Sequence, residues 1–185
     1  MILNFVTSND NKFREVKQIL SKFQIDVKQV KIELIEPQVE DIKEVSKIKA
    51  IQAFEKLKEP VFVEDAGLFI DSLNGFPGAF SAFVYKKIGC EGILQLMKNK
   101  SNREAFFASS IAFMSFSLKE PAIFYAEVYG KITKEKRGSS GFGFDPIFIP
   151  NGYDKTFAEL GEEKNEISHR RKALNLFIEF LLKNR

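Results

Sequence analysis

Short apolar runs and helix-like segments alternate in the first part of the chain. Ile2 to Val6 is an apolar run that predicts a β-strand, and it ends at the polar turn from Thr7 to Lys12. A weak alternation from Asp26 to Glu33 predicts a second strand, followed by an acidic stretch that Pro37 interrupts. Between the two strands a helix is predicted, because apolar residues recur at helical spacing, namely Phe13, Val16, Ile19, Leu20 and Phe23.

The same pattern continues to about residue 80. A helix is predicted from Asp41 to Leu57, and Pro60 terminates it. Val61 to Val63 then predicts a strand that runs into two acidic residues, and Gly67 to Leu73 predicts a further strand. The glycines and proline between Asn74 and Gly78 close this segment with a loop.

Longer strands dominate the second half. Ala105 to Ser117 and Ala122 to Thr133 predict two strands paired as a hairpin, and the glycine-rich segment from Arg137 to Asp145 predicts a loop. Ile147 to Ile149 predicts a short strand. A last helix presents one apolar face, formed by Ala173, Leu174, Phe177, Ile178, Leu181 and Leu182. We therefore expect an α/β protein with a mixed or antiparallel sheet, in which residues 1–185 form one domain.

Composition and charge narrow the classes of function. With 44% apolar residues among 185, the chain can bury a sizeable core, and with 20 Phe and no Trp any ring stacked on a ligand is Phe or Tyr. The 28 basic and 25 acidic residues are dispersed, which argues against the basic stripe of a nucleic-acid-binding domain. Cys90 is the only cysteine, so an internal disulfide and a multi-cysteine zinc site are excluded. We expect a soluble cytosolic protein, because neither a leader pattern nor an apolar run of about 18 residues occurs.

The turn from Thr7 to Lys12 is a candidate phosphate site. Backbone N–H groups at the start of a helix are unpaired and partly positive, and Lys12 adds a full charge. Ordinary capping of the helix by Ser8, Asn9 or Asp10 also explains the pattern. No Walker-type Gly-Lys-Ser signature is present.

Glu64 and Asp65 form a candidate metal site at the end of an apolar strand. Carboxylate oxygens are the ligands that Mg²⁺ prefers. Because adjacent residues of a strand point to opposite faces, we expect only one of the two to face a ligand. Glu36 and Glu40 are both candidates for a second metal ligand, and a solvated turn is the alternative interpretation.

Two later segments are candidates for binding a base. In Gly141 to Pro146, glycines allow close backbone approach, and Phe142 or Phe144 offers a flat ring. The segment from Glu162 to Arg171 contains the only histidine and many hydrogen-bond donors. The alternative for the first segment is a turn whose phenylalanine rings pack in the core. The alternative for the second is a solvated helix start.

Six segments, taken in order, closely resemble the inosine triphosphate pyrophosphatase family of nucleotide hydrolases. The first, Thr7-Ser8-Asn9-Asp10-Asn11-Lys12, is similar to the family's opening Thr/Ser-x-Asn-x-x-Lys turn. The others are Val63 to Leu68, Gly75 to Ser81, Phe142 to Pro146, Thr156 to Leu160 and Glu163 to Arg170. The match covers essentially the whole chain.

The resemblance implies two α/β lobes around a long central mixed sheet flanked by helices, with the substrate in a cleft between the lobes and a homodimer as the assembly. It implies hydrolysis of non-standard purine nucleoside triphosphates (ITP, dITP and XTP) to the monophosphate and pyrophosphate, which removes damaged nucleotides from the precursor pool. The implied cofactor is Mg²⁺, as one divalent cation or more. Neither nucleic acid nor membrane is an expected partner.

The resemblance also assigns roles to individual residues. The triphosphate lies on the first turn and Lys49, the metal on Glu36 and Asp65, and the general base is Asp65. The base and sugar lie against Phe142 to Asp145, with Lys164, His169 and Arg170 closing over them. The substrate-binding set is thus Thr7, Ser8, Asn9, Asp10, Asn11, Lys12, Lys49, Ala66, Phe142, Gly143, Phe144, Asp145, Lys164, His169 and Arg170.

The chemistry that we expect is attack of a metal-activated water on the α-phosphorus, with pyrophosphate leaving. Donors from His169 and Arg170 match the 6-oxo acceptor of hypoxanthine and are left unpaired against the 6-amino group of adenine. One departure from the family is Ala82, where many members have Lys or Arg; Lys86 is a candidate to replace that contact.

Two alternative functions belong to different classes. A purine nucleotide sensor without turnover keeps the phosphate and base sites but does not need Asp65. An RNA-binding domain is disfavoured by the dispersed charge.

Overall fold

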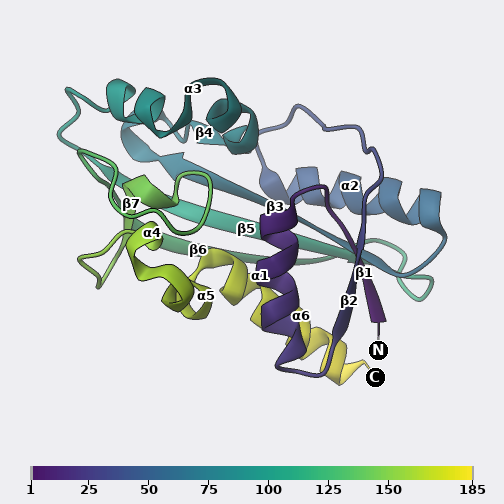
Figure 1. Ribbon diagram of the computed structural model, residues 1–185. Coiled ribbons are helices and arrows are strands. Elements are labelled where there is room, and N and C mark those ends of the chain that lie inside the picture. Colours follow the sequence, from purple (N-terminus) through teal and green to yellow (C-terminus); the bar gives the residue numbers. More distant parts are fainter. Residues whose placement is uncertain (1, 185) are drawn as a thin grey trace. The chain divides into compact units, whose positions relative to one another are not determined.

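The structure, a computed structural model, describes residues 2–184. Helices and strands alternate as far as β3, and longer strands follow (Figure 1). The strands are β1 (Ile2–Val6), β2 (Asp26–Val30), β3 (Val61–Ile70), β4 (Pro77–Gly78), β5 (Glu104–Met114), β6 (Ala122–Ile132) and β7 (Phe148–Pro150). The α-helices are α1 (Asp10–Ser21), α2 (Ile42–Leu57), α3 (Ser81–Leu96), α4 (Phe157–Leu160), α5 (Lys164–Ile167) and α6 (His169–Lys183).

The strands form one mixed sheet in the order β2-β1-β3-β5-β6-β7, with β4 paired to β3. Strand β1 pairs in parallel with β2 and β3, whereas β3–β4 and β6–β7 are antiparallel pairs. The predicted α/β class, with a long mixed sheet flanked by helices, is confirmed. Strands β5 and β6 are neighbours in the sheet and consecutive in the chain, as a hairpin requires.

The described residues divide into two compact units. Unit 1 contains residues 2–65, 109–126 and 170–184, and unit 2 contains residues 66–108 and 127–169. Strands β3, β5 and β6 each contribute residues to both units. No helix within residues 2–184 is long and apolar enough to cross a membrane.

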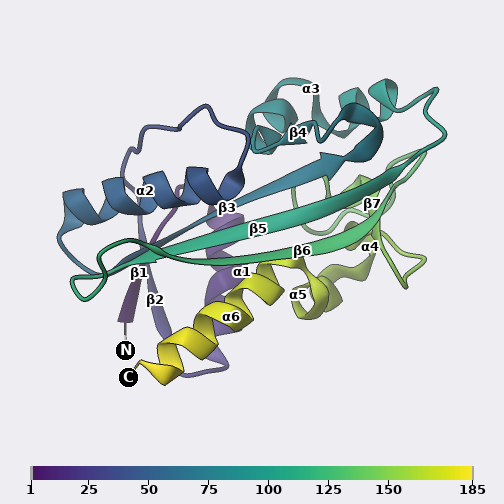
Figure 2. The same cartoon turned by 180° about the vertical axis from the view of Figure 1, so that it is seen from behind.

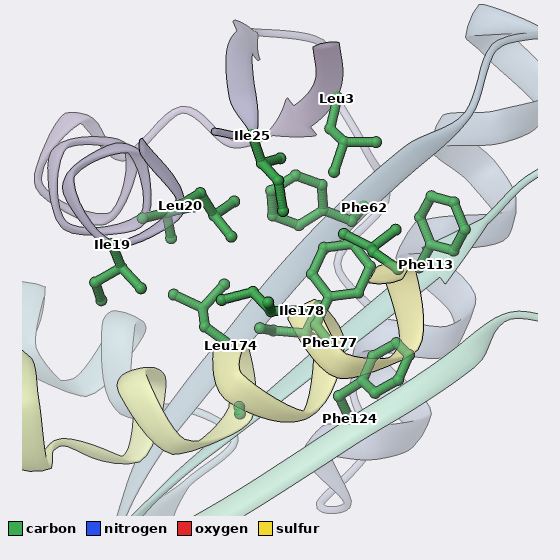
Figure 3. Close-up of a cluster of buried hydrophobic side chains, with 14 of the residues drawn as sticks. Leu3, Ile19, Leu20, Ile25, Phe62, Phe113, Phe124, Leu174, Phe177 and Ile178 are labelled. Carbon is green, nitrogen blue, oxygen red and sulfur yellow. The ribbon is translucent and has the colours of Figure 1, made fainter. Parts of the chain in front are cut away.

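Unit 1 has helices on both faces of its strands: α1 and α6 lie on one side and α2 on the other (Figures 1 and 2). The α1/α6 side is aromatic (Figure 3), and the ring of Phe62 lies 4.5 Å from that of Phe5 and 5.1 Å from that of Phe177. Each such buried side chain contributes about 1.5–3 kcal/mol relative to an exposed one. The α2 side contains the smaller Ala50, Ala53, Val61 and Val63. Consecutive residues of β3 thus pack into opposite cores, as strand alternation requires.

Unit 2 has a core of its own beneath α3, α4 and β7. The ring of Phe107 on β5 is central to it, with centroids 4.9 Å from Phe148 and 4.7 Å from His169. Phe157 and Phe144 belong to the same cluster. His169 therefore ends unit 2 stacked on an aromatic ring.

Two expectations about local structure are corrected. Val61 to Val63 and Gly67 to Leu73 are one strand, β3, which continues through the acidic pair as far as Ile70 and leaves only a 3₁₀ turn at Asp71–Leu73. Gly67 lies inside this strand, and a side chain is excluded there because a Cβ would lie 2.3 Å from the carbonyl oxygen of Gly78 on β4.

The second correction is α3, which the sequence pattern did not predict. Its hydrophobic side chains are not confined to one face: Phe83, Tyr85 and Ile88 are exposed, so the helical stripe is absent. Gly89 interrupts the helix with φ 60° and ψ −164°. Helices α4 and α5, of four residues each, were too short to produce a periodic pattern.

Candidate functional site

The turn between β1 and α1 is a capped helix start. Asn9 is the N-cap residue, and its Oδ1 accepts hydrogen bonds from the backbone N–H groups of Asn11 and Lys12 at 3.0 and 3.1 Å. The hydroxyl of Thr7 accepts from Asn9 N–H at 3.1 Å. Asp10 is tied to β2, since its Oδ1 accepts from Gln29 and lies 2.7 Å from Lys31 Nζ. The capping interpretation is therefore correct for Asn9, and it fixes the direction in which Lys12 leaves the helix.

Lys12 extends from α1 to the acidic pair within β3. Its Nζ donates to the backbone carbonyl of Glu64 at 2.9 Å and lies 2.9 Å from Glu64 Oε2. The Lys12 side chain is 17% exposed, so part of it is accessible beside the strand. The first turn and the acidic strand end, two of the segments singled out in the sequence, thus meet within unit 1.

Glu64 and Asp65 point to opposite faces of β3. Glu64 is directed to the α1/α6 side, where it pairs with Lys12 and Arg170, and Asp65 to the α2 side, where its Oδ1 lies 2.8 Å from Lys49 Nζ. The Glu64 side chain is fully buried, whereas that of Asp65 is 14% exposed. Only Asp65 remains accessible to a ligand.

Lys49 joins the two acidic segments of the site. Its Nζ lies 2.8 Å from Asp65 Oδ1 and 3.1 Å from Glu36 Oε2. Glu40, the other acidic residue considered, makes no contact with this group among residues 2–184. The structure therefore brings Glu36, and not Glu40, to Asp65.

The surroundings of Glu64 and Asp65 shift the pKa values of the two carboxyl groups in opposite directions. Burial raises the pKa of Asp65, and the charges of Lys49 and Lys12 oppose that rise only in part, so the pKa remains above its ordinary value. Burial also disfavours the charged form of Glu64, but Arg170 and Lys12 outweigh it and hold the pKa of Glu64 well below its usual range. Burial alone would lower the pKa of Lys49, but the charges of Asp65 and then Glu36 raise it.

The residues around Asp65 fit a divalent cation. Asp65 Oδ2 is buried and has no hydrogen-bond partner within the described chain, so one carboxylate oxygen is available. The Glu36 side chain is 66% exposed, and its one ion pair within residues 2–184 is with Lys49. No group of three or more His, Cys, Asp and Glu side chains is assembled as a metal site in residues 2–184. A Mg²⁺ ion here would complete its coordination with water and phosphate oxygens, as this ion commonly does.

In unit 2, Asp145 and Lys164 form a buried pair beside Phe142. Lys164 Nζ donates to Asp145 Oδ2 at 2.8 Å, and the same oxygen accepts from Phe142 N–H at 2.9 Å. Lys164 Nζ also lies 4.9 Å from the centroid of the Phe142 ring. Gly141 is required in this loop, because its φ is +76° and a Cβ there would lie 2.2 Å from Asp145 Oδ2.

The candidate aromatic platforms differ in accessibility. Phe144 is 3% exposed and packs in the unit 2 core with its ring edge-on to Tyr85. Phe142 is half-buried. Of the two rings, only Phe142 therefore has a surface that a base can reach. Next to it Gly143, with φ +64°, has no atom near its Cβ position.

His169 and Arg170 are adjacent in the chain but belong to different units. His169 stacks on Phe107 in unit 2 with an interplanar angle of 9°. Arg170 is 1% exposed and pairs in unit 1 with Glu64, at 3.2 Å, and with Glu15. Sequence reasoning identified both residues but missed Glu15 and Ser109, which contact the same network. No local pattern marks either one, because their partners lie far away in the sequence.

The fold is that of an α/β protein, and the charged residues Lys12, Lys49 and Asp65 beside β3 suit a nucleotide hydrolase. The Ham1 family model matches residues 3–180, and the chain belongs to that family. It is 48% identical over 181 residues to the dITP/XTP pyrophosphatase of Methanopyrus kandleri, covering 97% of this chain and 96% of that one. The dITP/XTP pyrophosphatase of Thermococcus kodakarensis is 46% identical, over 100% of this chain and 99% of its own.

Solved structures agree with this membership. A HAM1 protein from Coxiella burnetii superposes with a TM-score of 0.87 at 30% identity, covering 99% of each chain. The Ham1 protein of Staphylococcus aureus gives a TM-score of 0.85 at 29% identity over the full length of both chains.

Proposed function

We propose that this chain hydrolyses non-standard purine nucleoside triphosphates such as dITP, XTP and ITP to the monophosphate and pyrophosphate. The observation that supports it most directly is that Lys12 contacts Glu64 and Lys49 contacts Asp65 at neighbouring positions of β3. Relatives at 46–48% identity over nearly the whole chain are dITP/XTP pyrophosphatases. Residues 1–185 then act as a single catalytic domain, to which both units contribute.

In this proposal unit 1 binds the triphosphate. The N-terminus of α1, with Thr7 to Asn11, offers partial positive charge, and Lys12 and Lys49 neutralise the phosphates. Water attacks the α-phosphorus and transfers a proton to Asp65, the bond to the bridging oxygen breaks, and pyrophosphate leaves. The raised pKa of Asp65 suits a general base, since it strengthens the affinity of the carboxylate for that proton.

Asp65 Oδ2 and Glu36 are the groups that would bind Mg²⁺. When bound, the ion supplies positive charge for the phosphate oxygens and lowers the pKa of water. Lys49 also contacts both carboxylates, so the chain provides a lysine that neutralises them when no metal is present.

Unit 2 binds the base in this proposal. Ala66, Phe142 to Asp145, Lys164 and His169 belong to it, and Arg170 follows directly in the chain. A 6-oxo group accepts hydrogen bonds from Lys164, His169 or Arg170, whereas a 6-amino group leaves such a donor unpaired. Each unpaired donor costs roughly 1–3 kcal/mol, which favours hypoxanthine and xanthine over adenine.

Assembly and location complete the proposal. An apolar hollow on unit 2, lined by Phe76, Phe80, Phe83, Val84, Lys87 and Ile88, supports a homodimer in which a second copy covers it. The single cysteine fits the reducing cytoplasm, and burial raises the pKa of Cys90 to about 11, which keeps the thiol unreactive. Neither nucleic acid nor membrane is part of the proposal.

The test is release of pyrophosphate from a panel of nucleoside triphosphates with and without Mg²⁺. We expect dITP, XTP and ITP to be cleaved at least 10-fold faster than dATP, in line with one or more unpaired donors against its 6-amino group, and excess chelator to abolish release. Equilibrium binding of the same nucleotides without release would instead identify a sensor and refute the enzymatic proposal.

A further inference from the structure

Glu64 lies at the centre of an ion-pair network within unit 1. The proposed reaction, as described so far, assigns no role to this network. Its carboxylate accepts from Ser109 Oγ at 2.7 Å and pairs with Lys12 Nζ at 2.9 Å and with Arg170 Nη2 at 3.2 Å. These partners come from β5, α1 and α6. The Glu64 side chain is fully buried, whereas its neighbour Asp65 is partly exposed and retains an unpartnered oxygen. Glu64 is therefore poorly placed to touch a substrate or a metal ion.

The contacts of Lys12 show what Glu64 does. Within residues 2–184, both polar contacts of the Lys12 ammonium are to Glu64, one to the side chain and one to the backbone carbonyl. A lysine ammonium has three N–H donors on a flexible four-carbon chain. Two fixed acceptors on a buried strand residue remove most of that freedom and leave the third donor for another acceptor. The direction of the third N–H is thus set by the position of Glu64.

We propose that Glu64 is a positioning residue, which holds the Lys12 ammonium in the orientation needed by the triphosphate during pyrophosphate release. The inference rests on the proposed function and on the assignment of Lys12 to the triphosphate. Glu64 does not contact the substrate and acts through Lys12. The shared contact with Arg170 fixes the carboxylate from its other side, so that Glu64 itself cannot move with the lysine.

A purely structural role for this buried ion pair makes a different prediction. In that case Glu64→Gln lowers the unfolding midpoint, but the molecules that remain folded have the kcat and KM of the parent. A positioning role predicts that kcat for dITP falls roughly 10- to 100-fold, the scale for a misplaced group. The KM does not rise, because loss of a negative charge does not weaken attraction for a triphosphate.

The decisive experiment is a double-mutant cycle with Lys12→Ala, measured as pyrophosphate release from dITP below the unfolding midpoint of every variant. If Glu64 acts through Lys12, Glu64→Gln has little further effect on kcat once Lys12 is absent. An equal fold-loss in both backgrounds would overturn the inference. The matched control is Glu120→Gln, which removes an exposed carboxylate paired with Lys47 and is expected to leave kcat unchanged in either background.

Two milder variants cover the case in which Glu64→Gln does not fold, since it leaves buried cations without their carboxylate. Ser109→Ala removes only the hydrogen bond to Glu64 Oε1 and should give a smaller loss of kcat that also disappears with Lys12→Ala. Glu64→Asp keeps the negative charge, but its side chain is one methylene shorter, so the carboxylate lies farther from Lys12. This variant should lower kcat at an unchanged KM. Parent kcat in both would refute positioning, whereas a parent protein that releases no pyrophosphate from dITP would refute the proposed function itself.

Discussion

Two neighbouring carboxylates acquire opposite properties because strand alternation sends them to different surroundings. Glu64 faces Lys12 and Arg170 and has a strongly lowered pKa, whereas Asp65 faces Lys49 on the α2 side and has a raised one. Divergent environments of this kind assign different roles to groups of the same chemistry. The residue with the lowered pKa remains a fixed anion, and the other can exchange a proton.

At this scale we predict that Asp65→Asn lowers kcat for dITP by at least about 10²-fold, the size of a general-base contribution. Asparagine keeps the volume but accepts no proton and binds a hard cation weakly. Nucleotide binding should suffer less, because Lys12, Lys49 and the unit 2 residues are unchanged. Steady-state kinetics and equilibrium binding measure the two effects. The control is Asp71→Asn, the same exchange at an exposed position. Full activity in Asp65→Asn would contradict the role assigned to Asp65.

Lys49→Met tests the lysine that joins Glu36 and Asp65. Removal of the ammonium leaves two carboxylates without their shared counter-charge, so Mn²⁺ should bind the nucleotide-free protein more tightly than it binds the parent. At the same time the KM for dITP should rise about 10-fold, because one charge-assisted hydrogen bond to phosphate is lost. Calorimetric titration with Mn²⁺ reports the first effect and kinetics the second. Unchanged Mn²⁺ affinity would show that Lys49 does not compete with a metal.

Sequence reasoning singled out the residues of the candidate site but not the contacts between them. The polar turn and the acidic strand end stand out because they follow apolar strands, and adjacency on a strand predicts that Glu64 and Asp65 diverge. The contact of Glu64 with Arg170 joins residues 106 positions apart, and that with Ser109 joins residues 45 positions apart. Ser109 lies within an apolar strand and Glu15 on the polar face of a helix. Their sequence neighbours therefore do not indicate that they contact Glu64 or Arg170.

Among the elements, α4 is short and depends on its cap. Thr156 and Glu159 form a capping box, and Glu159 also pairs with Arg137, 2.8 Å away. The hydroxyl of Thr156 donates to the carbonyl of Arg137 at 2.8 Å. These contacts fix Arg137, at the start of the glycine-rich loop that leads to Phe142, so the stability of α4 bears on the proposed base site.

A pH dependence of stability follows from Glu159. The hydrogen bonds from Arg137 and the Thr156 backbone lower its pKa to about 2 from the ordinary glutamate value of 4.5. A lowered carboxyl pKa stabilises the folded state above the unfolded value, and this contribution is lost as pH falls from about 4.5 toward 2. We expect Glu159→Gln to be less stable than the parent near pH 6, with the difference shrinking below pH 4.5. Urea unfolding at several pH values measures it, and a difference independent of pH would contradict the assignment.

Prediction of the helices succeeded where one face is apolar and failed where the apolar residues surround the helix. Helices α1 and α6 were predicted because their apolar residues recur at helical spacing, whereas strand β1 was predicted from a short apolar run. In α3 the apolar side chains of Phe83, Tyr85 and Ile88 face outward beside buried Val84 and Ile93, which removes the periodic contrast. Burial of Phe144 in the unit 2 core, likewise, depends on packing against distant segments and not on its glycine-rich neighbours.

At the scale of the whole molecule, the chain passes between the units at residues of the candidate site. Asp65 ends the first segment of unit 1 and Ala66 begins unit 2, and His169 and Arg170 stand at another passage. In the proposed function Asp65 acts at the phosphate and Ala66 belongs to the base side, so residues proposed for the two ends of the nucleotide are covalently adjacent. A nucleotide whose two ends require different chemistry is suited to such a division, which composition and local periodicity do not reveal.

The exposed side chains of α3 predict how the whole molecule assembles. Phe83 is 62% exposed and lines the apolar hollow with Phe76, Phe80 and Ile88, a group that a soluble monomer would leave in water. In a two-fold dimer the same patch of both copies meets, so Phe83→Glu places two like charges in one apolar interface. We expect the parent to sediment as a dimer and Phe83→Glu as a monomer at micromolar concentration. Phe116→Glu, at a phenylalanine of unit 1 that is 71% exposed, should leave the dimer intact. A monomeric parent, or a dimer that tolerates Phe83→Glu, would show that another surface or none mediates assembly.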